Sequence, residues 1–294
     1  MSMESAYSSW INVKQILDLI GSHPVCRENI ERFLISHANR VSDKQLIDEL
    51  FLVECERKNI KCDMETILNM HMILKQRHKV PKALPFNCLK SISSNRMRLL
   101  LSYPRATRYD VLKTYLKYDS CLPGGQQWSI PEDVYRLLVE DFGVTIEAFA
   151  SPFNSQIIRF GHRYCSMFRE YDSIFGSLGS FFEYVPPPGT ILCVNPPFIL
   201  DIVNQTVLRC LDQVQKIKDL TYILVLPNWT DADFYGKIQE SPYNRYMTVM
   251  ERGKYTFTFR QSSKEIVCNV LFAVIGNHSE VRSDYSRILD QWAR

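Results

Sequence analysis

Four residues in the second half of the chain have the types and spacing that suit methyl transfer: Asn195-Pro196-Pro197-Phe198. The side-chain oxygen of Asn195 and the carbonyl of Pro196 can both accept hydrogen bonds from one exocyclic amino group. Phe198 can stack on the ring that carries this group. The lone pair of such an amine is delocalised, so holding both N–H groups turns the nitrogen toward a methyl sulfonium without a strong base. The tetrad predicts methylation of a planar amino group.

The residues around the tetrad predict that it follows a strand of an open sheet. Thr190–Val194 is apolar or small, which indicates a buried strand. The two prolines end that strand because they can neither continue a ladder nor enter a helix interior. A helical pattern follows from Asp201. Open α/β sheets bind ligands at strand ends, so we interpret the tetrad as a site loop. A surface turn with a Pro-Pro kink is the alternative.

Strands and helices alternate on both sides of the tetrad, which predicts an α/β sheet with both faces covered. A helix is predicted to begin at Ser129 as N-cap and to end near Phe142-Gly143. Lys254–Arg260 alternates and predicts an edge ribbon near the substrate. The further predicted strands are Thr145–Ala150, Tyr222–Leu226, Tyr246–Met250 and Ile266–Ile275.

Two loops and one tryptophan are further candidates for binding. Ser151–Asn154 follows a predicted strand but lacks the glycine fingerprint of nucleotide-binding loops. A helix, a strand and a small-residue loop in this order form the cofactor half of many methyltransferases. Phe175–Gly179, preceded by Asp172, is a glycine loop or an ordinary turn. Trp229 at a strand end is either a lid on the core or a stacking platform.

The part of the chain before the sheet is predicted to be helical. We place a helical accessory and RNA-binding region at residues 1–118 and the sheet domain at residues 119–294. The periodic apolar residues between Ile11 and Met72 favour a scaffold. A zinc site is not expected, because the four candidate ligands lack the tight ligand pairs of structural zinc sites. These candidates are Cys55, Cys62, His71 and His78.

Positive charge is concentrated in one block. Residues 75–117 hold eleven lysines and arginines but one acid, Asp110, and the segments on either side have net negative charge. Basic residues interleaved with tyrosines suit contacts with phosphates and stacking on bases. The alternative is a basic patch that faces the acidic segments of the chain itself. The predicted RNA-binding residues are Arg96, Arg98, Arg105, Arg108, Lys113, Lys117 and Trp229.

The cysteines and the apolar runs indicate a compartment. Nine scattered cysteines without a CxxC pair predict reduced thiols in the cytoplasm or nucleus. The first residues lack the features of a signal peptide. The longest apolar run, Val267–Ile275, is too short to cross a bilayer. Secretion and membrane insertion are therefore not expected.

Residues from about 120 to 277 resemble the phosphorylated CTD-interacting factor family, the cap-specific adenosine N6-methyltransferases. The resemblance lies in the shared order of short motifs over roughly 150 residues, each weak alone. These are Gly124–Trp128, Phe142-Gly143, Phe149–Asn154, Tyr164-Cys165, Phe175–Ser177, Asn195–Phe198, Pro227–Trp229 and Asn269. Two features depart from the family. The loop has Phe153 where leucine is expected, and no two tryptophans lie about twenty residues apart as in a WW domain, so no polymerase-tail tether is expected.

The resemblance implies a Rossmann-like class I S-adenosylmethionine-dependent sheet with an N-terminal helical region. It implies methylation of N6 of the adenosine after the m7G cap, with capped RNA as partner and no metal. Asn195, Pro196, Pro197 and Phe198 carry over to the target base. The cofactor side comprises Ala150, Ser151, Pro152, Phe153, Asn154, Asp172, Phe175, Gly176 and Ser177. The alternatives are adenine in other RNA or in DNA, a glutamine amide in a protein, and a non-catalytic RNA-binding relative.

Overall fold

The computed structural model describes residues 2–20, 69, 72–73, 76–81, 85–121, 127–259, 262–265, 268–278 and 284–293. The chain forms two compact units. The first consists of Met1–Ser91 and Arg105–Gly125, and the second of Ile92–Pro104 and Gln126–Arg294. The sequence-based prediction divides the chain once, between residues 118 and 119. In the structure the chain enters the sheet-bearing unit already at 92–104, leaves it, and returns at 126.

The described part of the first unit contains helices and, at residues 76–81, irregular chain. It contains α1 (Met3–Ile20), the short 3₁₀ helix η1 (Phe86–Ser91) and α6 (Arg108–Cys121). α1 packs against α6, where the Trp10 indole N–H donates to Asp119 Oδ2 over 2.7 Å. His78 shares a hydrogen bond of 2.8 Å with Asn12 of α1. The helix faces predicted between residues 21 and 68, and Cys55, Cys62 and His71, lie outside the described residues.

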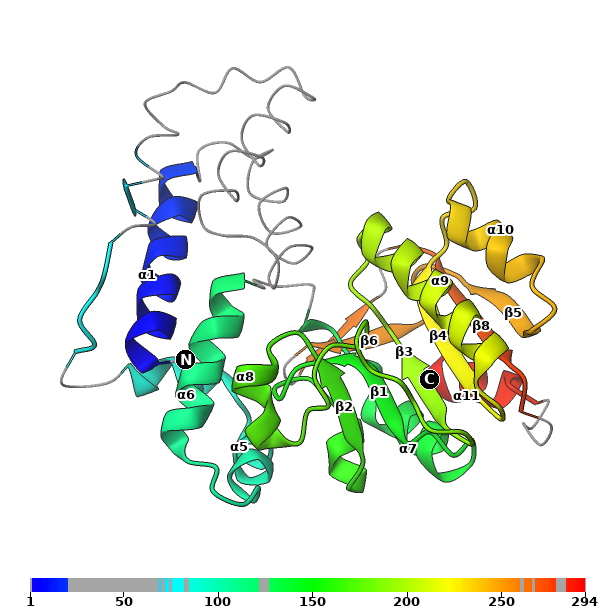
Figure 1. Cartoon of the computed structure of the whole chain (residues 1–294), viewed down its shortest axis with the longest axis horizontal. Coiled ribbons are helices and arrows are strands. Elements are labelled where there is room, and N and C mark those ends of the chain that lie inside the picture. Colours follow the sequence, from blue (N-terminus) through cyan, green and yellow to red (C-terminus); the bar gives the residue numbers. More distant parts are fainter. Residues whose placement is uncertain are drawn as a thin grey trace. The chain divides into compact units, whose positions relative to one another are not determined.

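The second unit holds a six-stranded sheet and a separate two-stranded hairpin (Figure 1). The sheet strands are β1 (Ile146–Ala150), β2 (Arg163–Ser166), β3 (Ile191–Val194), β4 (Thr221–Pro227), β5 (Asn244–Met250) and β8 (Val270–Gly276), and the hairpin consists of β6 (Thr256–Phe259) and β7 (Ser262–Glu265). The helices are α5 (Ser94–Leu101), α7 (Glu132–Glu140), η3 (Ile157–Phe160), α8 (Arg169–Asp172), η4 (Ser173–Phe175), α9 (Leu200–Lys216), α10 (Asp233–Gln239) and α11 (Ser286–Trp292).

The strand order of the sheet is β2-β1-β3-β4-β8-β5. β2, β1, β3 and β4 are mutually parallel, and β8 runs antiparallel between β4 and β5. From β1 the chain proceeds to β2 on one side, whereas β3 and β4 follow on the other side. The order therefore reverses between β1 and β3, which makes this gap the topological switch point of the sheet.

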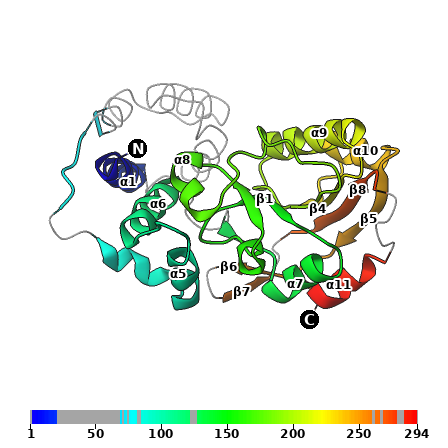
Figure 2. The same cartoon turned by 60° about the horizontal axis from the view of Figure 1, so that its bottom comes forward.

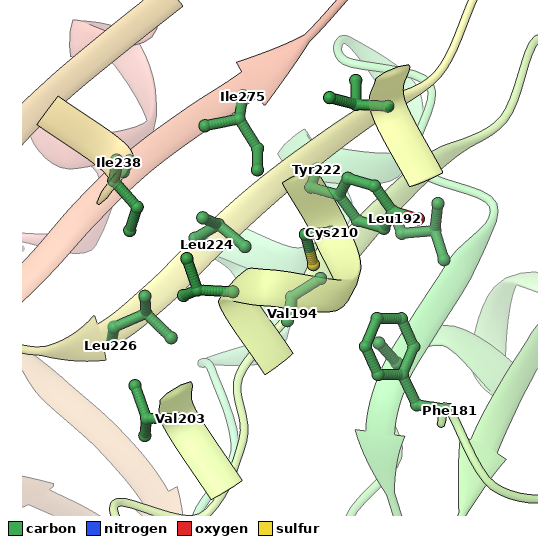
Figure 3. Close-up of a cluster of buried hydrophobic side chains, with 14 of the residues drawn as sticks. Phe181, Leu192, Val194, Val203, Cys210, Tyr222, Leu224, Leu226, Ile238 and Ile275 are labelled. Carbon is green, nitrogen blue, oxygen red and sulfur yellow. The ribbon is translucent and has the colours of Figure 1, made fainter. Parts of the chain in front are cut away.

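Helices cover both faces of the sheet, with α9 and α10 on one face and α7 and α11 on the other (Figures 1 and 2). On the first face, Val203 and Cys210 of α9 pack onto Val194 and Leu224 (Figure 3). Burying each aliphatic side chain of this kind contributes about 1.5–3 kcal/mol. The core thus fixes the strands whose carboxyl ends carry the candidate site.

Most predicted elements are confirmed, including the strands around Thr190–Val194 and Tyr222–Leu226 and the helix after the tetrad. The predicted N-cap at Ser129 is wrong. α7 begins at Glu132 after Pro131 without a side-chain cap, and Ser129 instead pairs with Thr258 of the hairpin through two backbone hydrogen bonds of 2.8 and 2.9 Å. The alternating segment forms the ribbon strand β6, and β2 was not predicted.

Candidate active site

The two candidate loops leave the sheet side by side at the switch point. β1 and β3 are neighbouring parallel strands, with Ile146 opposite Leu192 and Glu147 opposite Cys193. Ser151–Asn154 follows the carboxyl end of β1, and the tetrad follows the carboxyl end of β3. The structure thus brings together the loops that the sequence predicted for cofactor and target base, at the place where open α/β sheets bind ligands.

The tetrad loop is rigid but leaves polar groups available. Pro196 is buried, whereas Asn195, Pro197 and Phe198 are partly exposed. The Pro197 carbonyl accepts from the N–H of Ile199 over 2.8 Å, and α9 begins at the next residue. Within the described part of the chain, the Asn195 side chain and the Pro196 carbonyl make no hydrogen bond. Both acceptors are therefore unpaired within the described residues, and Asn195 is the partly exposed one of the two.

The loop after β1 is held by side chains. The N–H of Ser151 donates to Asn154 Oδ1 over 2.7 Å. The Ser151 hydroxyl lies 2.7 Å from Gln127 Oε1 and 3.0 Å from Asn154 Oδ1, and it accepts from the N–H of Phe153. These contacts impose a tight turn that glycines permit in other loops. Ala150, Phe153 and Asn154 are partly exposed, whereas Ser151 and Pro152 are buried.

The segment containing Ser177 lies along the outer edge of β2. Leu178 N–H donates to Tyr164 O, Ser166 N–H donates to Gly179 O, both over 2.8 Å, and the hydroxyls of Ser166 and Ser177 lie 2.6 Å apart. Because Ser166 pairs with Ala150 of β1, Ser177 lies toward the same end of the sheet as the loop after β1.

Asp172, Phe175 and Gly176 have structural contacts in this segment. Asp172 and Phe175 are fully buried, and Asp172 accepts from the N–H of Phe168 over 3.3 Å. Gly176 has a φ of 83°, and a Cβ there would lie 2.9 Å from the Tyr103 ring. Only glycine fits this close approach in the left-handed region. These three residues shape the segment, and the Ser177 hydroxyl lies beside Ser166 at the end of β2.

The predicted RNA-binding residues are divided between the two units. Arg98 and Trp229 belong to the second unit, and Trp229 packs edge-to-face on Phe234 beside the core cluster. In the first unit Lys113 forms an ion pair of 3.7 Å with Asp110 on α6. The remaining residues of that unit's set are Arg105 and Arg108, which are exposed, and Lys117, which is partly buried.

Arg96 was predicted to bind RNA, but its side chain is buried, since the residue is only 5% exposed. On α5 it lies one turn before Leu100, and both face the interior of the second unit. Burial, followed by the charge of Arg159, lowers the pKa of Arg96 to about 10, and the charge of Glu147 counteracts this shift. A guanidinium in this position is buried inside the protein, where an RNA phosphate cannot reach it.

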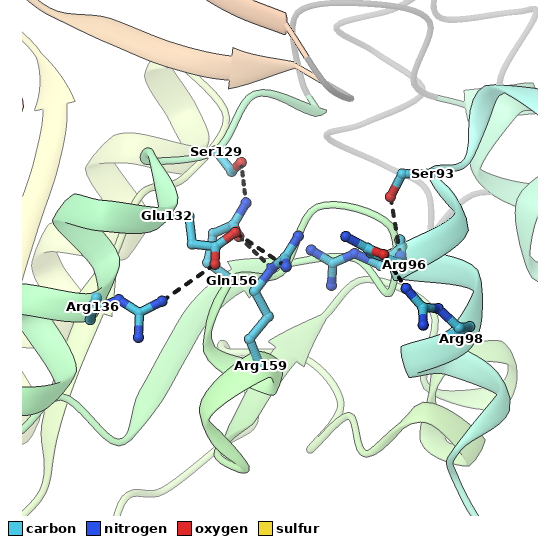
Figure 4. A network of polar contacts seen from close by, with 9 residues as sticks. Ser93, Arg96, Arg98, Ser129, Glu132, Arg136, Gln156 and Arg159 are labelled. Carbon is cyan, nitrogen blue, oxygen red and sulfur yellow. Dashed lines mark hydrogen bonds and ion pairs between the residues drawn. The ribbon is translucent and has the colours of Figure 1, made fainter.

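A polar network connects α7 with the chain after β1 (Figure 4). Gln156 Nε2 donates to the Ser129 hydroxyl over 3.0 Å, and Gln156 Oε1 accepts from Arg159 Nε over 3.1 Å. Arg159 also forms an ion pair of 3.2 Å with Glu132. This network joins the segment at Ser129 to the chain that follows the candidate cofactor loop.

Two residues of the site, Gln127 and Glu147, were missed from the sequence. Gln127 contacts Ser151, and its position in the Gly124–Trp128 motif was the available signal. Glu147 is buried in β1 and accepts hydrogen bonds from residues 155–157. A lone acid inside an otherwise apolar strand was the signal for it.

Comparisons of the sequence with known proteins identify a family. The fold is a mixed α/β unit with a mostly parallel central sheet and a loop site at its switch point. The sequence profile described as phosphorylated CTD interacting factor 1 WW domain matches residues 99–259, more than half of the chain. The chain belongs to this family. The matched residues include β1 to β6 of the second unit and contain two tryptophans, Trp128 and Trp229.

Two curated relatives match over a shorter range. Both are named mRNA (2'-O-methyladenosine-N(6)-)-methyltransferase, one from Mus musculus and one from Homo sapiens. Each is 28% identical over 145 residues, which is 48% of this chain and 20% of the relative. The match thus spans about a fifth of the length of these relatives. Within the described ranges, every helix is too short or too polar to span a bilayer.

Proposed function

We propose that this chain is an S-adenosylmethionine-dependent methyltransferase acting on N6 of the adenosine next to the m7G cap of mRNA. The observation that carries the proposal is the placement of the Asn195–Phe198 turn beside the loop after β1 at the switch point. A transferase needs donor and acceptor in one crevice, and the carboxyl ends of β1 and β3 supply adjacent walls for one. We assign the sheet to the Rossmann-like class I methyltransferases on the same grounds.

The residues at the carboxyl end of β1 fit the cofactor side. Ala150, Phe153 and Asn154 are partly exposed there, and the backbone of the loop is already fixed by the contacts of Ser151. S-adenosylmethionine supplies an electrophilic methyl group on a sulfonium. Ser177 and the residues before it would limit the crevice on the side of β2.

The tetrad supplies the acceptor side. Asn195 Oδ1 and the Pro196 carbonyl are unengaged acceptors that would hold the two hydrogens of the adenine amino group. Phe198 would stack on the adenine, which contributes about 1–3 kcal/mol. Pro197 stiffens the turn, so the acceptors are positioned before the substrate arrives. Catalysis then depends on alignment of the nitrogen, because fixed geometry removes much of the barrier of a bimolecular step.

The substrate assignment follows the relatives, whose names specify 2'-O-methyladenosine in mRNA. Capped RNA is the proposed partner, with phosphate contacts from the exposed Arg98 in the second unit and from Arg105 and Arg108 in the first. The free thiols of Cys165, Cys193 and Cys210 are buried, which is compatible with a reducing cytoplasm or nucleus.

A methyl-transfer assay on four substrates tests this proposal. The purified chain is incubated with S-adenosylmethionine and m7G-capped RNA beginning with 2'-O-methyladenosine, the same RNA uncapped, duplex DNA, or a glutamine-containing peptide. Mass spectrometry should find one methyl group on N6 of the first nucleoside of the capped RNA. Methylation of DNA or peptide in its place would contradict the substrate. Absence of cofactor binding by calorimetry would favour a non-catalytic RNA-binding relative.

A further inference from the structure

Glu147 is a buried acid in a central strand of the sheet. It is 7% exposed, with Cys193 of β3 and Tyr164 of β2 as its strand neighbours. An ionised carboxylate in this position is strongly unfavourable unless hydrogen bonds and a compensating charge hold it. The role of Glu147 therefore depends on the groups that satisfy it.

One oxygen of Glu147 accepts three hydrogen bonds from consecutive residues. The Ser155 hydroxyl donates over 2.7 Å, the N–H of Gln156 over 3.0 Å and the N–H of Ile157 over 3.3 Å. These residues come directly after the loop 151–154. The carboxylate therefore fixes the far end of this loop, while Gln127 and Asn154 fix its near end.

The same contacts occupy two N–H groups at the start of η3, the short helix after β1. In dinucleotide-binding folds, the N–H groups at the start of the helix after β1 bind the pyrophosphate. In this chain the corresponding N–H groups of Gln156 and Ile157 point at Glu147, and the carboxylate adds a negative charge beneath them. A cofactor with phosphate groups would meet repulsion there, and a cofactor without them would not.

We propose that Glu147 is the positioning residue of the loop 151–154 and adapts it to a cofactor that lacks phosphate groups. This inference rests on the proposed function and specifies how its cofactor loop is built. Glu147 acts through the loop and takes no part in the transfer of the methyl group.

The environment of Glu147 makes its hold on the loop 151–154 sensitive to pH. Burial raises the pKa of Glu147 to about 7, although the hydrogen bonds from residues 155–157 and the charge of Arg96 oppose the shift. Burial also raises the pKa values of the neighbouring thiol and phenols, so these groups stay neutral near pH 7, and Arg96 stays charged. The groups facing this cluster are Tyr135 of α7, Cys193 of β3, Tyr164 of β2, Arg96 of α5, and Glu132 and Arg159 through Arg96.

Protonation of Glu147 replaces a negative acceptor by a neutral one and weakens its hold on residues 155–157. The loop is therefore expected to be fixed above pH 7 and loosened below it.

Calorimetry with S-adenosylmethionine between pH 6 and 8.5 tests the inference on three full-length proteins. The dissociation constant of the unsubstituted chain should rise about tenfold from pH 8 to pH 6, because one pH unit below the pKa costs about a factor of ten. Glu147→Gln should bind about tenfold more weakly at pH 8 and should show no such pH dependence. Glu140→Gln is the control, an exposed acid of α7 that forms an ion pair of 3.7 Å with Arg136, and it should follow the unsubstituted chain.

Hydrogen exchange gives a readout that needs no cofactor. The amides of Gln156 and Ile157, which donate to Glu147, should exchange at least tenfold faster in Glu147→Gln than in Glu140→Gln. ADP should not displace bound S-adenosylhomocysteine from the unsubstituted chain, and displacement at equal concentration overturns the phosphate exclusion.

The outcomes separate the inference from the proposed function. If Glu147→Gln binds S-adenosylmethionine with the affinity and pH profile of the unsubstituted chain, the positioning role is wrong and the function stands. If the unsubstituted chain binds no S-adenosylmethionine, the proposed function fails first. If Glu147→Gln does not fold, the pH profile of S-adenosylmethionine binding to Ser155→Ala tests the positioning role instead. The loss of one donor raises the pKa of Glu147 and shifts the binding profile to higher pH, and an unshifted profile overturns the inference.

Discussion

The two loops at the switch point are held in opposite ways. The loop after β1 is fixed by its own side chains and by contacts from Gln127 and Glu147 on either side. The loop after β3 is fixed by two prolines, and its Asn195 side chain and Pro196 carbonyl make no hydrogen bond within the described residues. The Ser151 and Asn154 side chains of the first loop are thus bonded within the protein, whereas we propose that the acceptors of the second loop bind a ligand.

This difference suits the two roles that we propose for the loops, which are cofactor binding and orientation of the target amino group. A loop that shapes a cofactor site benefits from rigidity that does not depend on the cofactor, because less order must be gained on binding. A loop that orients a reacting amino group needs free acceptors at a fixed position. Substitutions in the two loops should therefore affect different measured quantities, and the predictions below run from the largest expected effect to the smallest.

Asn195→Ala should lower the turnover number about a thousandfold, since removing one preorganised polar contact to a reacting group costs about 2.7–4 kcal/mol. The dissociation constant of S-adenosylmethionine should change less than twofold. Single-turnover methylation and calorimetry measure the two quantities. Gln205→Ala, an exposed amide on α9, is the control. Turnover within fivefold of the unsubstituted chain would remove Asn195 from the site.

Arg96→Met should lower the free energy of unfolding more than Arg98→Met does, because Arg96 is a buried positive charge that favours the ionised form of Glu147. Urea denaturation at pH 8 provides the measurement. Arg98→Met on the same helix removes an exposed guanidinium that bonds to Asn95, and should cost under about 0.5 kcal/mol. Equal effects of the two substitutions would show that burial of Arg96 carries no compensating role.

The stability of the second unit should depend on pH through Glu147. Its pKa is about 7 when folded and 4.5 in the reference state, so the folded state binds the proton more tightly between these values. The contribution of Glu147 to the free energy of unfolding should then fall by up to about 3 kcal/mol as pH rises from 4.5 to 7, and stay level above. Glu147→Gln should remove this slope from urea titrations at pH 5, 6, 7 and 8. An unchanged slope would assign the titration to another group.

Phe198→Ala should raise the KM for capped RNA about thirtyfold, equivalent to about 2 kcal/mol of lost stacking. The affinity for S-adenosylmethionine should stay within twofold, and Phe198→Tyr should restore most of the KM because the ring is retained. Steady-state kinetics with varied RNA concentration give the result. A loss of cofactor affinity in Phe198→Ala would mean that the two loops do not divide the work as described.

The sequence predicted the sheet well because its central strands are nearly continuous apolar runs ended by prolines, as in Ile191–Val194 and Thr221–Pro227. It missed β2, because Arg163–Ser166 is a short strand of mixed polarity whose outer neighbour is the irregular segment around Ser177. The error at Ser129 arose because a hairpin far along the chain competes for its backbone. Local patterns cannot report such partners.

For the site, the sequence identified both loops but not the residues that hold the first one. Motif order led to Ser151–Asn154 and to the tetrad, whereas Glu147 and Gln127 act through contacts that only the fold creates. Arg96 was read as part of a basic surface, although its spacing of four residues from Leu100 places both on one helix face. Charge alone did not distinguish a surface arginine from one that compensates a buried acid.

The position of bound S-adenosylhomocysteine tests the central claim most directly. A crystal structure of the complex should place the ligand at the carboxyl ends of β1 and β3, with its amino-acid and ribose groups along residues 150–154 and its sulfur facing Asn195. Ligand density elsewhere in the chain, or an Asn195 side chain turned into the protein interior in the complex, would contradict the account.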